Sequence, residues 1–452
     1  MRYSYRSFIG SPNNSIHIIL YHCLISCKAR SIVNRPILAL TSFILLAFVV
    51  ACGSAKIGSI DADQGKTGLS ASMQRYIEQW QGLEAHENEF FSSFSYFALS
   101  GLSYEPGVSR RDPSTIIKVG DQYHLYYTRS TVNAAPVGYK HANQDLPATT
   151  WDMSAIYHAT SHDGKAWEEQ GVAVKPGPQG EFDDRSVFTP DILVYNGRYY
   201  LYYQAVRFPY TERSRNVIGM SWADSPEGPW HRHPDPILKP GKSGEWVEGS
   251  LRRAHIKTYG DFDSHKVHDP NLLIRNGQIW MYYKAHPMGL GSERKPPAGV
   301  ELKKPYPNFS MGLAIADKPE GPFVKHSMNP VSASGHEAVI WPFKNGVAAL
   351  ITANGPEKNT VQWAEDGINF NVKAHVVMPP DAAGVYCPDK FTNTTVGEGF
   401  TWGISHVPQS KVKPWAHLIG FKCDLSSIAN DAKHKRENIR YDEHARFNST
   451  RR

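Results

Sequence analysis

The chain has 452 residues, of which 41% are hydrophobic and 20% charged, which excludes a disordered, acidic or collagen-like protein and leaves ample length for a core. Its 12% aromatic content, 36 Gly and 31 Pro predict many turns between aromatic segments. The formal net charge of +6 would suit a nucleic-acid binder, but residues 1–52 hold five of the Lys and Arg residues and no Asp or Glu. The remainder has 44 basic and 43 acidic side chains, so we expect no nucleic-acid partner.

The N-terminal segment has the pattern of an export signal. Basic residues precede an apolar run over residues 37–51, which is shorter than a membrane span requires. The sequence Val49-Val50-Ala51-Cys52 resembles a bacterial lipobox, whose cysteine is lipidated. We therefore predict a lipoprotein signal peptide over 1–52 and a tether over 53–69. The alternative is an uncleaved anchor or a signal without lipid. An exported lipoprotein held to the membrane through Cys52 would be periplasmic or anchored in the outer membrane of a Gram-negative bacterium.

Residues 70–100 are predicted to form a pair of short helices in front of the main domain. Apolar residues recur at helical spacing from Met73 to Trp80, and a second aromatic cluster extends from Phe90 to Phe97.

At the other end of the chain, residues 431–452 are charged and lack periodicity, which predicts a solvated tail. The two body cysteines, Cys387 and Cys423, have no zinc-type spacing. A disulfide between them after export is the alternative, but we expect two buried thiols.

Residues 101–430 contain a repeat. Each copy has an Asp-Pro-like opening, an apolar strand, a Gly-containing turn and an aromatic strand, which predicts a β-hairpin. The clear copies are residues 112–127, 189–203 and 269–283, and weaker ones begin at His336 and Cys387. A second hairpin follows the copies, and two hairpins make the four-stranded blade of a propeller. The sequence thus predicts an all-β fold, a five-bladed β-propeller with a short N-terminal helical extension. A β-sandwich or a parallel β-helix would not explain the recurring opening.

Acidic residues open the repeats. Because the first strand of every propeller blade lines the central axis, we expect these acids to meet at one mouth. They are Asp112, Asp191, Asp269, Glu337 and Asp389. A single Asp before Pro is usually a turn cap, but carboxylates crowded in one pocket carry a cost that points to chemistry. Clustered carboxylates with nearby aromatic rings suit glycoside hydrolysis.

Three motifs resemble one known family. Gly107-Val108-Ser109-Arg110-Arg111-Asp112-Pro113-Ser114, His268-Asp269-Pro270-Asn271 and Gly335-His336-Glu337-Ala338 are similar to blade motifs of glycoside hydrolase family 117, the α-1,3-(3,6-anhydro-L-galactosidases) or neoagarobiose hydrolases. The Arg-Asp-Pro opening is shared with arabinan- and xylan-cleaving propellers, whereas Gly-His-Glu-Ala is more specific. The resemblance covers roughly residues 70–423.

The resemblance implies roles for four residues. Asp112 would be the general base that activates water, and His336 the general acid. Glu337 would bind the sugar or orient His336, and Asp269 would hold substrate or tune its neighbours. Because adjacent residues of a strand point to opposite faces, His336 and Glu337 reach one pocket only if the backbone kinks, which Gly335 favours. Without a kink, Glu337 alone would be the acid.

The remaining candidates would bind substrate. They are Arg111, Thr189, Asp191, Gln204 and His268. We predict no protein-built metal site and no required cofactor, although the resemblance leaves room for a divalent cation near the pocket. The resemblance also implies that the helical pair of 70–100 is exchanged between subunits of a homodimer.

The resemblance implies that the substrate is a short agar-derived oligosaccharide. The expected reaction is release of its terminal 3,6-anhydro-L-galactose, with inversion. Two alternatives are an arabinosidase- or xylosidase-like propeller and a glycan-binding propeller without catalysis.

Overall fold

The computed structural model describes residues 68–78, 88–130, 134–211, 213–246, 256–258, 260–288, 307 and 309–429. The predicted signal peptide of 1–52, most of the tether and the tail of 431–452 lie outside the described residues. Within the described ranges, no helix has the length and apolar character needed to cross a membrane.

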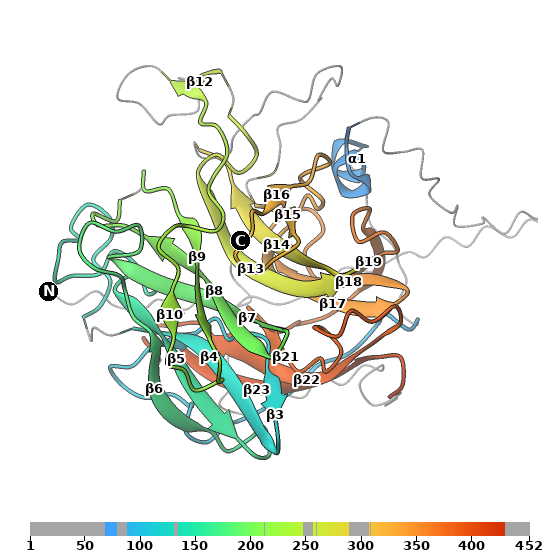
Figure 1. The fold of residues 1–452 in the computed structure, drawn as a ribbon, viewed down its shortest axis with the longest axis horizontal. Helices are drawn as coiled ribbons and strands as arrows, with labels where there is room; N and C mark the ends of the chain where they lie inside the picture. Colours follow the sequence, from blue (N-terminus) through green and yellow to red (C-terminus); the bar gives the residue numbers. More distant parts are fainter. Residues whose placement is uncertain are drawn as a thin grey trace, which may run out of the picture. The chain divides into compact units, whose positions relative to one another are not determined.

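The described chain is nearly all β. Its helix is α1 (Ala71–Glu78), and its strands form curled sheets that follow one another along the sequence (Figure 1). The first sheet has the order β2-β4-β5-β6 with β3 beside β4: β2 (Arg110–Arg111), β3 (Ile117–Val119), β4 (Gln122–Ser130), β5 (Ser154–Ser161) and β6 (Glu168–Val174). The second consists of β7 (Ser186–Tyr195), β8 (Arg198–Val206), β9 (Val217–Ala223) and β10 (His231–Arg232).

Two further sheets complete the middle of the chain. A two-stranded sheet pairs β11 (Glu245–Trp246) with β12 (Ile256–Thr258). The next comprises β13 (Lys266–Arg275), β14 (Gln278–His286), β15 (Ser310–Ala316) and β16 (Val324–Lys325). The last sheet, of eight strands, contains β1 (Ser95–Phe97), β17 (His336–Lys344), β18 (Gly346–Ala353), β19 (Thr360–Ala364), β20 (Asn371–His375), β21 (Gly384–Val385), β22 (Gly397–Val407) and β23 (His417–Ser426).

The predicted hairpin turns are present where the sequence has Asn-Gly. Tyr195 pairs with Arg198, and Arg275 with Gln278, so two residues close each turn. Asn196 and Asn276 have φ of 50° and 53°, and the glycines that follow them also have positive φ. Two consecutive positive φ values are the signature of the type I′ turn, whose twist matches that of paired strands. Local turn chemistry therefore sets the register of these hairpins.

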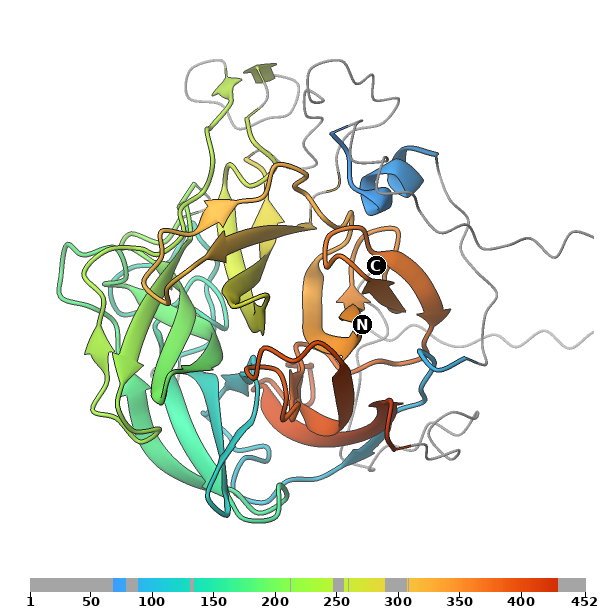
Figure 2. The ribbon, with the colours of Figure 1, turned by 45° about the vertical axis from the view of Figure 1, so that its right-hand side comes forward.

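The strands that open successive sheets come together. β7 packs against both β4 and β13, and β13 also packs against β17. Figure 2 shows these sheets turned about a common centre, in a propeller-like arrangement. The openings of the repeats therefore lie near one another, although they are far apart in sequence.

Two sequence predictions are wrong in detail. Residues 94–97 are not helical: β1 pairs with the edge of β23, because that strand offers unpaired backbone groups and Phe94 is fully buried beneath. The fifth repeat does not open at Cys387. β21 precedes it, and residues 388–395 form turns leading to β22.

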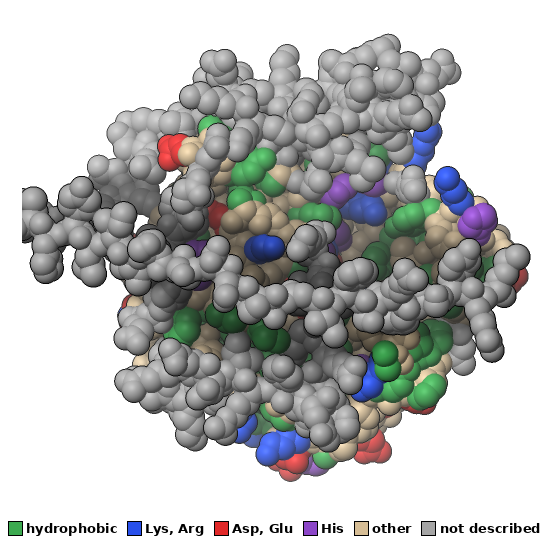
Figure 3. Space-filling view, turned by 180° about the vertical axis from the view of Figure 1, so that it is seen from behind, with side chains coloured by type: hydrophobic (Ala, Val, Ile, Leu, Met, Phe, Trp, Pro, Cys, Tyr) green, Lys and Arg blue, Asp and Glu red, His purple; other side chains and the backbone are tan. Residues whose placement is uncertain are grey.

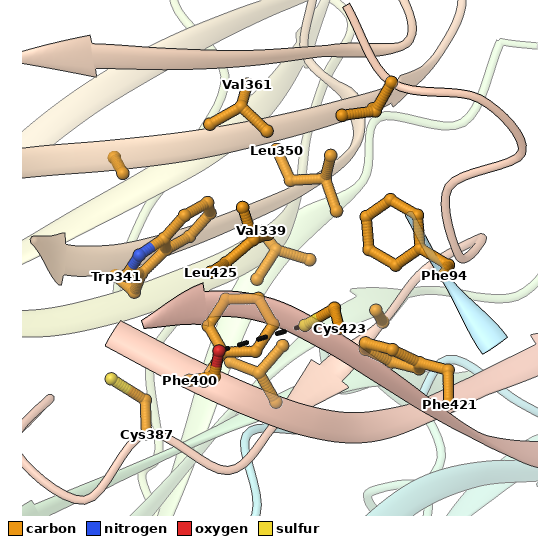
Figure 4. Packing of buried hydrophobic residues seen from close by; sticks show 14 of the residues in the cluster. Phe94, Val339, Trp341, Leu350, Val361, Cys387, Phe400, Phe421, Cys423 and Leu425 are labelled. Atoms are coloured by element: carbon orange, nitrogen blue, oxygen red, sulfur yellow. Dashed lines mark hydrogen bonds between the residues drawn. The ribbon is translucent and has the colours of Figure 1, made fainter. Parts of the chain in front are cut away.

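A large apolar cluster fills the space between β17–β19 and β22–β23. Figure 4 shows Phe94, Trp341 and Phe400 converging there, with the Cys423 thiol directed at the Phe400 carbonyl oxygen, 3.8 Å away. Cys387 and Cys423 are both free and buried, as predicted.

Side chains of helix α1 form hydrogen bonds and an ion pair with residues near the start of β17. The Ser72 hydroxyl donates to the buried Glu357 carboxylate and accepts from the Ala333 backbone N–H, both at 2.7 Å. Arg75 adds an ion pair with Glu357, 2.8 Å long. These bonds hold α1 against the segment that leads into His336.

Candidate active site

The repeat openings share an unusual backbone conformation. Asp112, Thr189, Asp269 and Glu337 have φ between 48° and 58°, the left-handed region that non-glycine residues rarely adopt. At Thr189 and Asp269 the pairing register also shifts, as in a β-bulge. A bulge turns a side chain away from the face that strict alternation would give it. Each repeat therefore directs the side chain of its opening residue to the shared centre.

These side chains line one cavity of about 280 Å³. This volume is at the small end for ligand pockets. Its walls are formed by Arg111, Asp112, Trp151, Phe188, Thr189, Gln204, Tyr210, Lys266, His268, Asp269, Lys284, His286, Phe309, His336 and Glu337. The pocket thus combines carboxylates, cations and aromatic rings from four sequence repeats.

Asp112 is buried and held ionised. The Arg111 Nε lies 3.1 Å from one carboxylate oxygen, and His406 Nδ1 lies 3.2 Å from the other. Burial by itself raises the pKa of Asp112, but the charge of Arg111 and the contact with His406 outweigh it and leave the pKa below its ordinary value. An ionised carboxylate in this position can accept a proton at neutral pH.

His336 and Glu337 face the same pocket because the backbone kinks at Glu337, where φ is 58°. Gly335 makes the approach possible, since a Cβ there would lie 2.5 Å from the Met311 backbone nitrogen. His336 Nε2 lies 3.2 Å from Glu337 Oε1. Burial raises the pKa of Glu337, but the charge and hydrogen bond of His336 reverse this, and the pKa falls well below its ordinary value.

Two further contacts fix the position of the His336 ring. Its Nδ1 is hydrogen-bonded to the Asn354 side-chain oxygen. Its ring stacks on Phe309, with centroids 4.7 Å apart and planes 16° from parallel. With an acceptor at each ring nitrogen, a doubly protonated His336 would have a partner for both of its N–H groups.

Asp269 differs from the other two pocket carboxylates. It forms an ion pair with Lys284 and lies 3.5 Å from His268 Nδ1. Burial raises its pKa more than Lys284 lowers it, and nearby Glu337 raises it further, so the net pKa of Asp269 is above its ordinary value. The pocket therefore raises the pKa of Asp269 and lowers the pKa values of Asp112 and Glu337. Such a difference between neighbouring carboxyl groups is typical of sites where one group acts as an acid and another as a base.

Two of the predicted acids are not pocket residues. Asp191 lines a smaller adjoining cavity of about 40 Å³, and its carboxylate accepts from the Thr115 and Leu272 backbone N–H groups, both at 2.8 Å. Asp389 accepts from the Glu398 backbone N–H at 2.7 Å and caps a turn. Neither residue has the left-handed φ of the opening residues. In the second repeat the opening position is held by Thr189, two residues before Asp191, and in the last part of the chain the left-handed non-glycine residues include Met378, Ala382 and Asn393.

Comparison with known proteins identifies the family. The chain is 38% identical, over 78% of its length and 96% of the other chain, to Zg3597, a family 117 glycoside hydrolase of the marine bacterium Zobellia galactanivorans, with a TM-score of 0.67. The chain belongs to glycoside hydrolase family 117.

Two more distant matches are also to glycoside hydrolases. The model of glycosyl hydrolases family 43 matches residues 107–247, which include Asp112 and Asp191. A structure described as a glycoside hydrolase is 13% identical over 83% of this chain and 98% of its own, with a TM-score of 0.50, and supports the fold. The protein is thus a glycoside hydrolase with a propeller-like fold, as the sequence motifs predicted.

Several functional contacts of this family 117 enzyme lie outside the motifs. His406, at the end of β22, meets Asp112 only through the pairing of sheets, and no repeat points to it. Lys284 could have been found, because it directly follows Tyr282-Tyr283, as Gln204 follows Tyr202-Tyr203. The residues after Tyr126-Tyr127, Tyr202-Tyr203 and Tyr282-Tyr283 lie near the openings of the repeats: Gln204 lines the pocket, Lys284 pairs with Asp269, and Thr128 Oγ1 accepts from the Thr189 N–H at 2.7 Å.

Within the described ranges of the family 117 chain, no group of three or more His, Cys, Asp or Glu side chains is placed to hold a metal ion. His265 approaches His286, whereas His268 approaches Asp269.

Proposed function

We propose that this family 117 enzyme is an exo-acting α-1,3-(3,6-anhydro-L-galactosidase). It would remove the terminal 3,6-anhydro-L-galactose of neoagarobiose and longer neoagarooligosaccharides, with inversion. The observation that carries the proposal is the meeting of Asp112 with the His336–Glu337 pair in one small pocket. A pocket of about 280 Å³ suits one sugar ring at a chain end better than the middle of a polymer.

In the proposed reaction, Asp112 accepts a proton from a water molecule as the water oxygen attacks the anomeric carbon. The glycosidic C–O bond breaks, and His336 donates a proton from Nε2 to the leaving oxygen. The products are 3,6-anhydro-L-galactose of inverted configuration and the shortened oligosaccharide. Arg111 keeps Asp112 charged, and Glu337 stabilises the protonated His336 before the transfer.

Aromatic and polar side chains would bind the sugar. Trp151, held by a 3.2 Å hydrogen bond from its indole to the Tyr210 hydroxyl, offers a ring face beside Arg111. Gln204 and Thr189 offer hydrogen bonds to sugar hydroxyls from the neighbouring wall.

We also propose that the sheets form five blades, that the mature chain is exported and lipid-anchored through Cys52, and that it forms a homodimer through residues 70–100.

The experiment is incubation of the purified protein with neoagarobiose, with release of anhydrogalactose followed by chromatography and the product anomer followed by proton NMR. Release of the inverted anomer is expected. Activity confined to aryl arabinosides or xylosides would replace this proposal with the arabinosidase- or xylosidase-like alternative. If wild type and Asp112→Asn bind the sugar equally and neither hydrolyses it, the protein is a glycan-binding propeller.

The identity of the acid needs a second measurement. A leaving group that needs no protonation, such as a dinitrophenyl glycoside, should restore much of the rate lost in the variant lacking the acid. We expect this rescue in His336→Gln and not in Glu337→Gln. Rescue of Glu337→Gln alone would assign the acid to Glu337 and leave His336 a positioning residue.

A further inference from the structure

One wall of the pocket carries an unusual group of basic side chains. β13 and β14 are antiparallel neighbours, and their register places Lys266 opposite His286 and His268 opposite Lys284. All four residues line the pocket. We call this group the β13–β14 basic block. Basic side chains directly opposite one another on a sheet repel and are normally avoided.

Lys266 differs from Arg111 and Lys284 in its partners. Each pocket carboxylate contacts basic side chains: Asp112 contacts Arg111 and His406, Asp269 contacts Lys284 and His268, and Glu337 contacts His336. Lys266 has no acidic partner among the described residues, and its ammonium group lies 5.9 Å from the centre of the Tyr210 ring. Lys266 is thus a pocket cation that none of the pocket carboxylates contacts.

His268 lies close to both lysines of this block. It is only 8% exposed, and its Nε2 is buried with no hydrogen-bond partner among the described residues. Burial and the nearby charges of Lys284 and Lys266 together hold its pKa well below the ordinary value. A neutral His268 therefore stands between two lysines. Histidines also adjoin Lys or Arg side chains on the face of the molecule drawn in Figure 3.

We propose that the β13–β14 basic block binds an anionic substituent, a sulfate ester or a carboxylate, on the sugar chain held in the pocket. The preferred substrate would then be a negatively charged galactan oligosaccharide rather than a neutral one. Lys266 would supply the charge, and an anion beside it would offset the repulsion within the block. This inference rests on the proposed function for the position of the sugar, and its test separates the two.

The experiment measures binding of single sugars, so it needs no turnover. Galactose, galactose 6-sulfate and galacturonate are titrated into the full-length protein at low salt in a calorimeter. At least one anionic sugar is expected to bind roughly tenfold more tightly than galactose. The preference should shrink as sodium chloride is raised. Which of the two anionic sugars gains more distinguishes sulfate from carboxylate recognition.

Three variants identify the residue responsible. Lys266→Met should abolish the preference for the anion, and Lys266→Arg should keep most of it. Lys318→Met, which removes the same charge from an exposed turn, should leave the preference unchanged. Lys266→Met should also unfold at the wild-type temperature or above it, because it relieves repulsion within the block. This control separates loss of the anion site from loss of the fold.

The outcomes are distinct. If the wild type binds all three sugars equally, or if the preference survives in Lys266→Met, the anion site is wrong whatever the enzyme hydrolyses. If the preference depends on Lys266 but no anhydrogalactose is released from any neutral or sulfated disaccharide, the anion site stands and the proposed hydrolysis fails.

Discussion

Two groups of carboxylates belong to the same repeat openings but serve different ends. In the pocket, Asp112 and Glu337 are contacted chiefly by other side chains, Arg111 and His336 respectively. In the adjoining cavity, Asp191 accepts from two backbone N–H groups and approaches the fully buried Lys390 ammonium at 3.5 Å. A carboxylate bonded to rigid backbone joins parts of the fold, whereas one bonded to side chains keeps the freedom to exchange a proton.

The contacts of Lys390 show why Asp191 has a structural role. Its ammonium donates to Asn271 Oδ1 at 3.0 Å and to the Thr115 hydroxyl at 2.5 Å, so it links segments of three repeats through Asp191. A buried charge of this kind is tolerated only when its hydrogen bonds are satisfied. Asp191 and Asp112 both adjoin a Pro, but Asp191 stabilises the fold whereas Asp112 lines the pocket as a reactive group.

The largest expected effect is on turnover by Asp112→Asn. The amide cannot accept the proton of the attacking water, so kcat should fall by about 10²–10⁴. Binding of sugar, measured by calorimetry, should change far less. A variant with near-normal kcat would remove Asp112 from the base role and would break the distinction between the two groups of carboxylates.

The complementary change is Asp191→Ala, which should act on stability. Removing one member of a buried charge pair leaves Lys390 and two backbone N–H groups without their acceptor, and we expect a loss of about 3–5 kcal/mol in the free energy of unfolding. Denaturant titration measures it. The matched control is Asp389→Ala, whose turn cap should cost only about 1 kcal/mol. Equal losses in the two variants would contradict the structural role assigned to Asp191.

A pH measurement separates the two groups further. Because the pKa of Asp112 is lower in the folded protein, its ionised form contributes stability above the unfolded-state pKa of about 3.9, and this contribution is lost as pH falls below that value toward the folded pKa. Asp112→Asn should therefore be less stable than wild type at pH 7, and the gap should narrow at pH 3. Denaturant titrations at both pH values check this. A gap of constant size would show that Arg111 and His406 do not depress the pKa.

The smallest effect concerns backbone strain at the pocket. Thr189 is β-branched, yet its φ is 49°, a conformation that Asn tolerates far better. Thr189→Asn is expected to raise the free energy of unfolding by up to about 1 kcal/mol. Thr189→Val, which keeps the β-branch, should bring no such gain. If Asn and Val behave alike, strain at this position is not a feature that distinguishes the pocket from the site of Asp191.

Much of the site could be predicted because it is written in local patterns. The Arg-Asp-Pro, His-Asp-Pro and Gly-His-Glu motifs identify Asp112, Asp269 and Glu337, and the residue after each Tyr-Tyr pair identifies Gln204 and, by the same rule, Lys284. His406 carries no such signal. It contacts Asp112 across 294 residues of sequence, and only the packing of sheets determines that approach.

The sequence by itself determined the β-hairpin repeats, their Asn-Gly turns and the family, because turn geometry and strand patterns depend on neighbouring residues. Only the tertiary structure decided which of the repeated acids would be reactive. That choice depends on a left-handed residue at the opening of a strand and on the backbone N–H groups within reach. The block formed by Lys266, His268, Lys284 and His286 was likewise decided by strand register, which sets basic residues opposite one another that lie 16 to 20 positions apart in the chain.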